Sequence, residues 1–288
     1  ILLIAWSANQ ANNLAVLLEP KGFSPYFTGA LVTAAVTFIL SGGVKRLGEV
    51  SDRLVPFMFF LYTGATSWII FSNFHKIPEV MSLLVSSVLS TNGAVGACLG
   101  FGFHQAMRWG LARATQTTEA GVGTNTFPHV VAQETTPFRQ GVLAMASVYA
   151  NGIICMLSGL TILVSDAWKI PGATFDIRMV SDILEANFPM FGPKVLVFSS
   201  FMFAFGTILG NNYNGSQCFL HATKGKWITG YRIVSAIAVF LGCISDAKFI
   251  WTIIDFFILP VAIPHTIAIL ILAFKKPHIL SKDESELD

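Results

Sequence analysis

The 288-residue chain is far more apolar than a water-soluble protein, with 53% hydrophobic and only 12% charged residues. Soluble domains carry about 25% charged residues, so the composition excludes a soluble enzyme, a secreted disulfide scaffold and a disordered protein. The net charge of +2, without any basic run, gives no support to nucleic-acid binding. The composition therefore indicates an integral membrane protein.

Charge-free stretches predict about eight membrane-spanning segments. In chain order they cover residues 1–18, 22–44, 54–75, 80–107, 140–165, 195–223, 233–245 and 249–274, the last interrupted by Asp255. An α-helix needs about 20 residues to cross the hydrocarbon, and in lipid a helix satisfies its own backbone groups. We therefore expect an all-α polytopic membrane protein, with a transmembrane domain over 1–280 and a polar cytoplasmic tail over 281–288.

The loops between these segments give further expectations. Lys and Arg are more numerous on the side that holds residues 45–53, 224–232 and 275–282, which places that side and the C-terminus in the cytoplasm. Charged residues alternate with apolar ones over 170–189, which predicts an outer loop with a short amphipathic helix. Because the chain begins with Ile1 inside an apolar run, we expect a fragment that starts within a helix.

The segment 92–129 departs from a simple span. Seven of the 24 glycines fall within residues 93–123, and residues 115–126 are polar. At membrane depth, unwound backbone is tolerated only where it lines a cavity, and transporters use such breaks to bind substrate and ion. A polar connection between two ordinary helices would look similar, so both interpretations stay open. Glu119 could likewise pair with Arg113 or face a cavity.

The cysteines and histidines do not form a recognisable chemical site. The four cysteines (Cys98, Cys155, Cys218 and Cys243) have neither CxxC nor Cys/His spacing, and the six histidines are not clustered. A membrane-embedded enzyme would bring acids, histidines or metal ligands together near one interface. The sequence therefore predicts no enzyme and no cofactor.

Specific motifs resemble the alanine or glycine:cation symporter family. The central one is EAGVG at 119–123, followed by His129 and by PFRQG at 137–141, where the family has an NEAG-type run and HPVRQG. Further similar pieces are QAN at 10–12, GGVKR at 42–46, VPFM at 55–58, FAFGTILG at 203–210 and AIP at 262–264. The resemblance extends along essentially the whole chain.

This resemblance implies a leucine-transporter-like fold, an inverted repeat of five plus five helices. The helices present would be core helices three to ten, with the glycine-rich segment as discontinuous helix six. About the first third of the family's chain would be absent, including a helix that supplies much of the sodium site, so the metal ligands stay unknown.

The resemblance also implies site residues. Gln10 and Thr207 match substrate-facing positions, and Asn211 stands where the family has tryptophan. Gln10 could instead bond a neighbouring helix, and Thr207 its own i−4 carbonyl. In the unwound stretch, Gln116 and Thr118 replace Phe and Asn.

The helix break itself comprises Thr117, Glu119, Gly121 and Gly123. The two glycines permit its backbone geometry, and Gly121 is also expected at the substrate. Glu119 is expected to fix the break by accepting hydrogen bonds.

Three further polar residues depart from the family or have structural explanations. Asn151 stands where many members have Asp, and His265 replaces a family Asn. His129 is interpreted as structural.

The function implied is secondary active transport in the bacterial inner membrane: symport of a small neutral amino acid, such as alanine or glycine, with a cation, expected to be sodium. The alternatives are a proton-coupled or exchange transporter of another small solute, an inactive truncated remnant, and, from another class, an embedded enzyme or channel.

Overall fold

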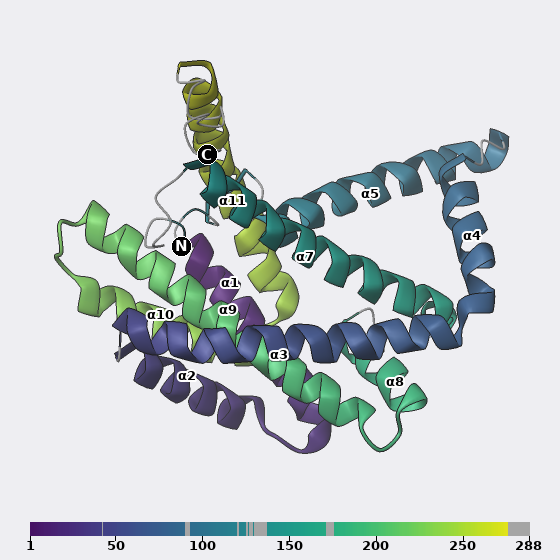
Figure 1. Cartoon of the computed structure of the whole chain (residues 1–288), viewed down its shortest axis with the longest axis horizontal. Helices are drawn as coiled ribbons and strands as arrows, with labels where there is room; N and C mark the ends of the chain where they lie inside the picture. The colour runs from purple at the N-terminus through teal and green to yellow at the C-terminus, as the bar shows by residue number, and fades with distance from the viewer. Residues whose placement is uncertain are drawn as a thin grey trace, which may run out of the picture. The chain divides into compact units, whose positions relative to one another are not determined.

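The computed structural model describes residues 1–41, 43–89, 93–119, 121–124, 126, 129, 137–170 and 176–275, and within them all regular secondary structure is helical, as predicted (Figure 1). The α-helices are α1 (Leu2–Leu18), α2 (Pro25–Ser41), α3 (Gly43–Ser72), α4 (Ile77–Leu89), α5 (Gly93–Thr118), α7 (Pro137–Val164), α8 (Ile177–Asn187), α9 (Gly192–Ala222), α10 (Ile228–Ile244) and α11 (Ala247–Lys275). Short 3₁₀ turns occupy Glu19–Lys21, Phe74–Lys76 and Ala167–Lys169.

The chain divides into two compact units. Unit 1 contains Ile1–Ser72 and Leu157–Phe257, and unit 2 contains Asn73–Met156 and Ile258–Asp288. Unit 1 therefore holds α1, α2, α3, α8, α9 and α10, and unit 2 holds α4 and α5. Helices α7 and α11 contribute one part to each unit.

Several helices suit a membrane by length and composition. In the described part of the chain, Phe138–Val164, Lys194–Ala222 and Ala247–Lys275 are long and apolar enough to cross a bilayer. Pro25–Leu40, Pro56–Ser72 and Ile228–Ile244 are apolar but shorter. These helices agree with a polytopic membrane protein, whereas the number of spans stays a prediction.

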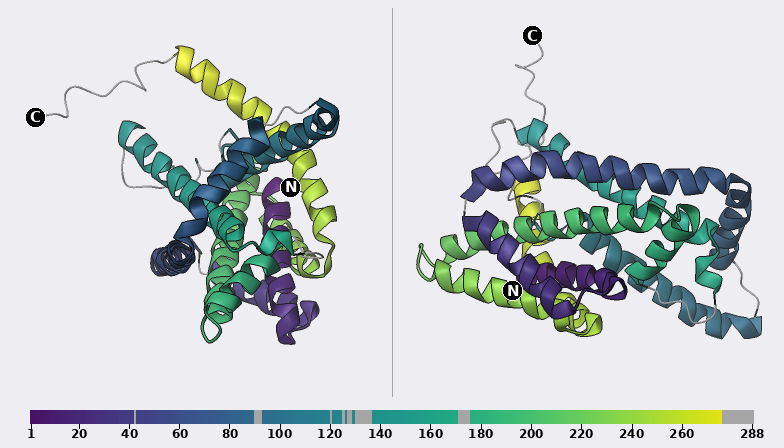
Figure 2. Two further views of the ribbon diagram at one scale, coloured as in Figure 1. Left: turned by 90° about the vertical axis from the view of Figure 1, so that its right-hand side faces the viewer. Right: turned by 90° about the horizontal axis from the view of Figure 1, so that it is seen from below.

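Helix α1 lies at the centre of unit 1, where it packs against α9, α10 and α2. In the views of Figure 2, α10 turns back beside α9 close to α1. Side chains of these helices form a buried apolar core. Helices α1 and α10 approach closely at Gly242, where an added Cβ would lie only 2.7 Å from the Cα of Ala8. The absence of a side chain at Gly242 is therefore what permits this packing.

Two loop predictions can be compared with the structure. The amphipathic helix predicted over 170–189 is confirmed as α8, which buries Met179, Ile183 and Leu184. The N-cap of α8 is Asp176, whose carboxylate accepts a hydrogen bond from the backbone N–H of Arg178. The same carboxylate forms an ion pair with the Arg178 guanidinium at 2.8 Å. The side-chain hydrogen bond to Asp176, together with the negative charge of Asp176, raises the pKa of Arg178 above its ordinary value.

The predicted tail 281–288 lies outside the described residues.

One predicted span is wrong in its extent. The single segment predicted over 80–107 is divided between α4, which ends at Leu89, and α5, which begins at Gly93. Residues 90–92, between the two helices, lie outside the described residues.

Candidate functional site

The polar segment after α5 is unwound in unit 2. Helix α5 ends at Thr118, so Gln116, Thr117 and Thr118, which were predicted to be unwound, are helical, and the predicted break begins too early. The backbone then adopts positive φ at Glu119 (53°), Gly121 (81°) and Gly123 (86°). Glycine adopts this region readily, whereas other residues do so at a cost. The two glycines thus allow a tight reversal that a continuous helix could not make.

Local hydrogen bonds hold this segment. The N–H of Val122 donates to the carbonyl of Glu119 at 3.1 Å, which closes a turn. The hydroxyl of Thr124 donates to the Glu119 carboxylate, and both Thr124 and Val122 are buried. Arg113, the alternative partner considered for Glu119, instead donates to Gln116. Glu119 therefore bonds across the unwound segment, as expected of a residue that stabilises it.

Two other helices of unit 2 contact the break. From α7, the amide of Asn151 donates to the carbonyl of Thr117 at 3.3 Å. This carbonyl belongs to the last turn of α5, where backbone acceptors lack partners within the helix. His265 and Thr266 belong to α11. The His265 ring is so close to Gly123 that a Cβ added to this glycine would lie 2.6 Å from the ring, and Thr266 lies beside Gly121.

The predicted site residues on α5 already have protein partners. The side-chain carbonyl of Gln116 accepts from Arg113, whose guanidinium lies 5.0 Å from the centre of the Trp109 ring. The hydroxyl of Thr118 donates to the carbonyl of Ala114 at 2.8 Å. Substrate contacts by these two side chains would have to use their remaining hydrogen-bonding capacity.

The other predicted site residues lie in unit 1, on the paired helices α1 and α9. Gln10 is half-buried and Thr207 is exposed, and neither side chain has a hydrogen bond to the described residues. Asn211 is buried, and its Nδ2 has no partner among them either. The helix-to-helix bond considered for Gln10 and the i−4 bond considered for Thr207 are therefore not formed. A buried donor without a partner costs about 1–3 kcal/mol, so Asn211 is suited to bind a further polar group.

A buried polar network in unit 1 was missed by the sequence analysis. Asn212 donates to Ser7 of α1 at 3.3 Å and accepts from Ser235 of α10. Asn12 donates to the carbonyls of Gly242 and Ser245 at 3.0 and 2.8 Å. The available signal was the presence of small polar residues inside otherwise apolar runs, but their partners are more than 20 residues away.

Some buried oxygens near these helices have no hydrogen-bond donor. Among the described residues, Oδ1 of Asn9, Oδ1 of Asn12 and Oγ1 of Thr28 find no hydrogen-bond partner. Within that part of the chain, His, Cys, Asp and Glu do not gather in groups of three that could hold a metal ion.

His129 is held by the protein. Its Nδ1 lies 2.7 Å from the side-chain oxygen of Gln140 in α7, so the ring and the amide share a hydrogen bond. This contact fits the structural interpretation of His129.

The sequence profile of the sodium:alanine symporter family matches residues 1–284. The chain belongs to this family. Among its relatives, an uncharacterized transporter of Haemophilus influenzae is 31% identical over 247 residues, which is 84% of this chain and 54% of that protein. The sodium/alanine symporter AgcS of Methanococcus maripaludis is 28% identical over 268 residues, 92% of this chain and 58% of AgcS.

A third relative bears on the coupling ion. The putative sodium/proton-dependent alanine carrier protein YrbD of Bacillus subtilis is 28% identical over 295 residues, 96% of this chain and 60% of YrbD. The chain thus spans between half and two thirds of the length of these relatives. The family is one of transporters, so membership agrees with the prediction that the protein is not an enzyme.

Proposed function

We propose that the protein is a secondary active transporter that couples entry of a small neutral amino acid, such as alanine or glycine, to an inward sodium gradient. Family membership supports transport, and the unpartnered polar groups support binding of a zwitterion. The observation that carries the proposal is the unpartnered Nδ2 of buried Asn211 on α9, which packs against α1, the helix that contains Gln10. The proposed location is the bacterial inner membrane, with several spans.

The chemistry follows from the groups available. A neutral amide can bond a substrate carboxylate or ammonium without the desolvation penalty of a buried charge. Gln10 offers both an amide donor and an acceptor, whereas Asn211 offers the donor Nδ2. Within unit 2 alone, the unwound backbone at Glu119 and Gly121–Gly123 leaves groups free that a helix would use internally. No covalent step is required.

Coupling requires two states with different affinities. A substrate and an ion can shift an equilibrium only by their difference in affinity between the states. In many transporters one bundle of helices moves against another around a central site. The proposal includes a leucine-transporter-like fold in which α5 and the unwound residues after it belong to discontinuous helix six.

The substrate preference is expected to follow residue 211. Asn211 replaces the large tryptophan of the family by a short amide, which leaves more room and adds a polar contact. We therefore propose a preference that differs from that of family members with tryptophan, in favour of a solute with an additional hydrogen-bonding group.

The test is uptake of labelled alanine by the intact protein in proteoliposomes. A sodium gradient should drive uptake, and replacement of sodium by choline should abolish it. Uptake that persists without sodium but is lost when the proton gradient is collapsed would instead establish proton coupling. Absence of uptake or exchange for all small neutral amino acids, by protein that is correctly inserted, would favour the inactive remnant.

A further inference from the structure

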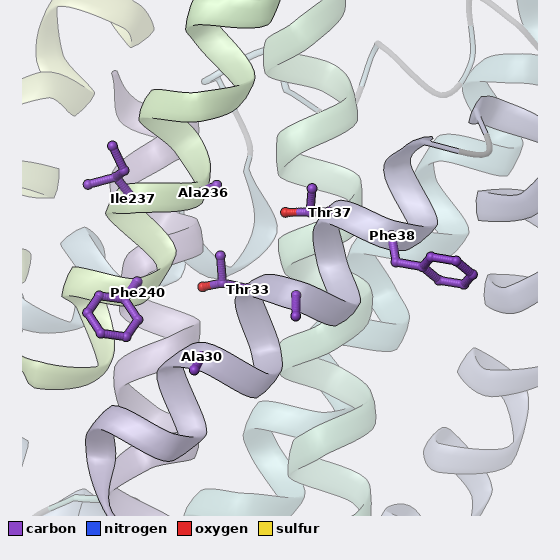
Figure 3. Close-up of a pocket in the computed structure, with 8 residues that line it drawn as sticks. Ala30, Thr33, Thr37, Phe38, Ala236, Ile237 and Phe240 are labelled. Atoms are coloured by element: carbon purple, nitrogen blue, oxygen red, sulfur yellow. The ribbon is translucent and has the colours of Figure 1, made fainter.

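An apolar groove runs between two helices of unit 1 and plays no part in the proposed transport site. Its volume is about 660 Å³, and Thr33 and Thr37 of α2 lie opposite Ala236 and Phe240 of α10 (Figure 3). The remaining lining residues are Ala30, Ala34, Phe38 and Ile237. Small-molecule pockets have volumes of about 300–1,000 Å³, so the groove is large enough for a ligand.

A smaller cavity, less apolar than the groove, adjoins it. It has a volume of about 110 Å³ and shares Thr37 and Ala236 with the groove. Arg232 lines it. Arg232 is exposed and has no ion-pair partner among the described residues. The groove and the cavity together therefore form one site that is apolar along the groove and has an unpaired cation, Arg232, in the adjoining cavity.

The sequence around Arg232 marks the membrane–water interface. Arg232 lies about one turn inside α10, and Lys224, Lys226 and Trp227 come just before this helix in the chain. Trp227 is 80% exposed. Trp and basic residues concentrate where spans leave the membrane. Phe240 lies eight residues further along α10, about 12 Å deeper at 1.5 Å per residue.

We propose that this site binds an anionic phospholipid. Its phosphate lies against Arg232, and one acyl chain lies in the groove between α2 and α10. Basic pockets between membrane helices on the cytoplasmic side are suited to lipid headgroups, and the loop charges place Arg232 on that side. The proposal requires only that α2 and α10 face lipid, so it does not depend on which solute is transported.

The charge of Arg232 also argues against a second copy of the chain as the occupant. The small residues of α2 could support close helix packing. In a symmetric dimer formed through this face, however, the two Arg232 side chains would lie at the same depth on facing surfaces. They would repel each other, whereas an anionic headgroup would neutralise the cation.

The experiment measures bound lipid by native mass spectrometry of the intact protein exchanged into equal amounts of phosphatidylglycerol and phosphatidylcholine. Wild type should retain phosphatidylglycerol preferentially. Arg232→Gln should weaken that preference about fivefold, since one basic residue at the membrane surface is worth about 1 kcal/mol. Ala34→Phe, which fills the groove, should release both lipids.

Matched controls decide the result. Lys224→Gln removes a positive charge from the loop before α10, outside the groove. Leu31→Phe adds bulk to α2 at an exposed position that does not line the groove. Both should retain lipid as wild type does. Equal retention by Arg232→Gln and wild type, or equal loss in Arg232→Gln and Lys224→Gln, would overturn the proposal.

Two further outcomes are decisive. If Ala34→Phe converts a dimer to a monomer without changing lipid retention, a second copy occupies the groove and the proposal is wrong. If the variants fail to fold, the proposal is tested instead by measuring thermal unfolding of the wild-type protein in vesicles. Phosphatidylglycerol must then raise the melting temperature above its value in phosphatidylcholine, and equal values would contradict the site.

Discussion

At the scale of single residues, Gly123 is subject to two independent constraints. Its φ is +86°, and an added Cβ would collide with the His265 ring. Gly225 provides a matched control, since its φ is +84° but nothing lies within 4 Å of an added Cβ. Both alanine variants should lose roughly 1–2 kcal/mol from the positive φ, and Gly123→Ala should lose more because of the ring.

Thermal unfolding of the two variants in detergent measures this difference. Adding His265→Ala to Gly123→Ala should recover the steric part of the loss but leave the backbone part. If Gly123→Ala is no less stable than Gly225→Ala, the contact between the break and α11 is wrong.

Gln10 is the residue whose substitution tests substrate contact most simply. Its side chain has no hydrogen bond to the described residues, so removal of the amide should affect the protein's stability little. Loss of one hydrogen bond to a charged group costs about 1.5–3 kcal/mol, so Gln10→Ala should weaken alanine binding more than tenfold. Alanine binding to purified protein measures this, and unchanged affinity would remove Gln10 from the site.

At the scale of elements, the packing of α10 on α1 depends on Gly242. Gly242→Ala would place a methyl group against the backbone of Ala8, and overpacking of this kind costs about 1–3 kcal/mol. Gly230, on the same helix, has open space around it. Gly230→Ala should be neutral or stabilising, because alanine is the better helix former. Unfolding of both variants in detergent gives the comparison, and equal stabilities would mean that the two helices do not pack as described.

The elements also show what the sequence could predict. Long charge-free runs identified most helices, and the alternation of charged and apolar residues identified α8. The division between α4 and α5 was missed because a count of charged residues cannot separate two helices within one uncharged run. The periodicity of a helix likewise does not predict that α7 and α11 each contribute residues to two units.

At the scale of the whole molecule, the candidate site was predictable only in part. The glycines after α5 suggested unwound backbone from composition, but the polar residues 115–118 were wrongly assigned to the same stretch, because they are helical. The residues that contact it, Asn151 and His265, are distant in sequence, and their pairing depends on tertiary packing. The Asn212 network escaped notice for the same reason. Local patterns therefore predict where a helix ends, whereas long-range contacts determine what surrounds that end.

The central proposal is that the unwound backbone after Thr118 lies at the site where the transported amino acid binds. Thr118→Cys in the intact protein, with the native cysteines replaced by serine or alanine, tests it through alkylation by a membrane-impermeant reagent. The account predicts that Cys at this position reacts, and that alanine together with sodium slows the reaction while either alone has less effect. A reaction rate that alanine and sodium leave unchanged, in protein that still transports, would contradict the account.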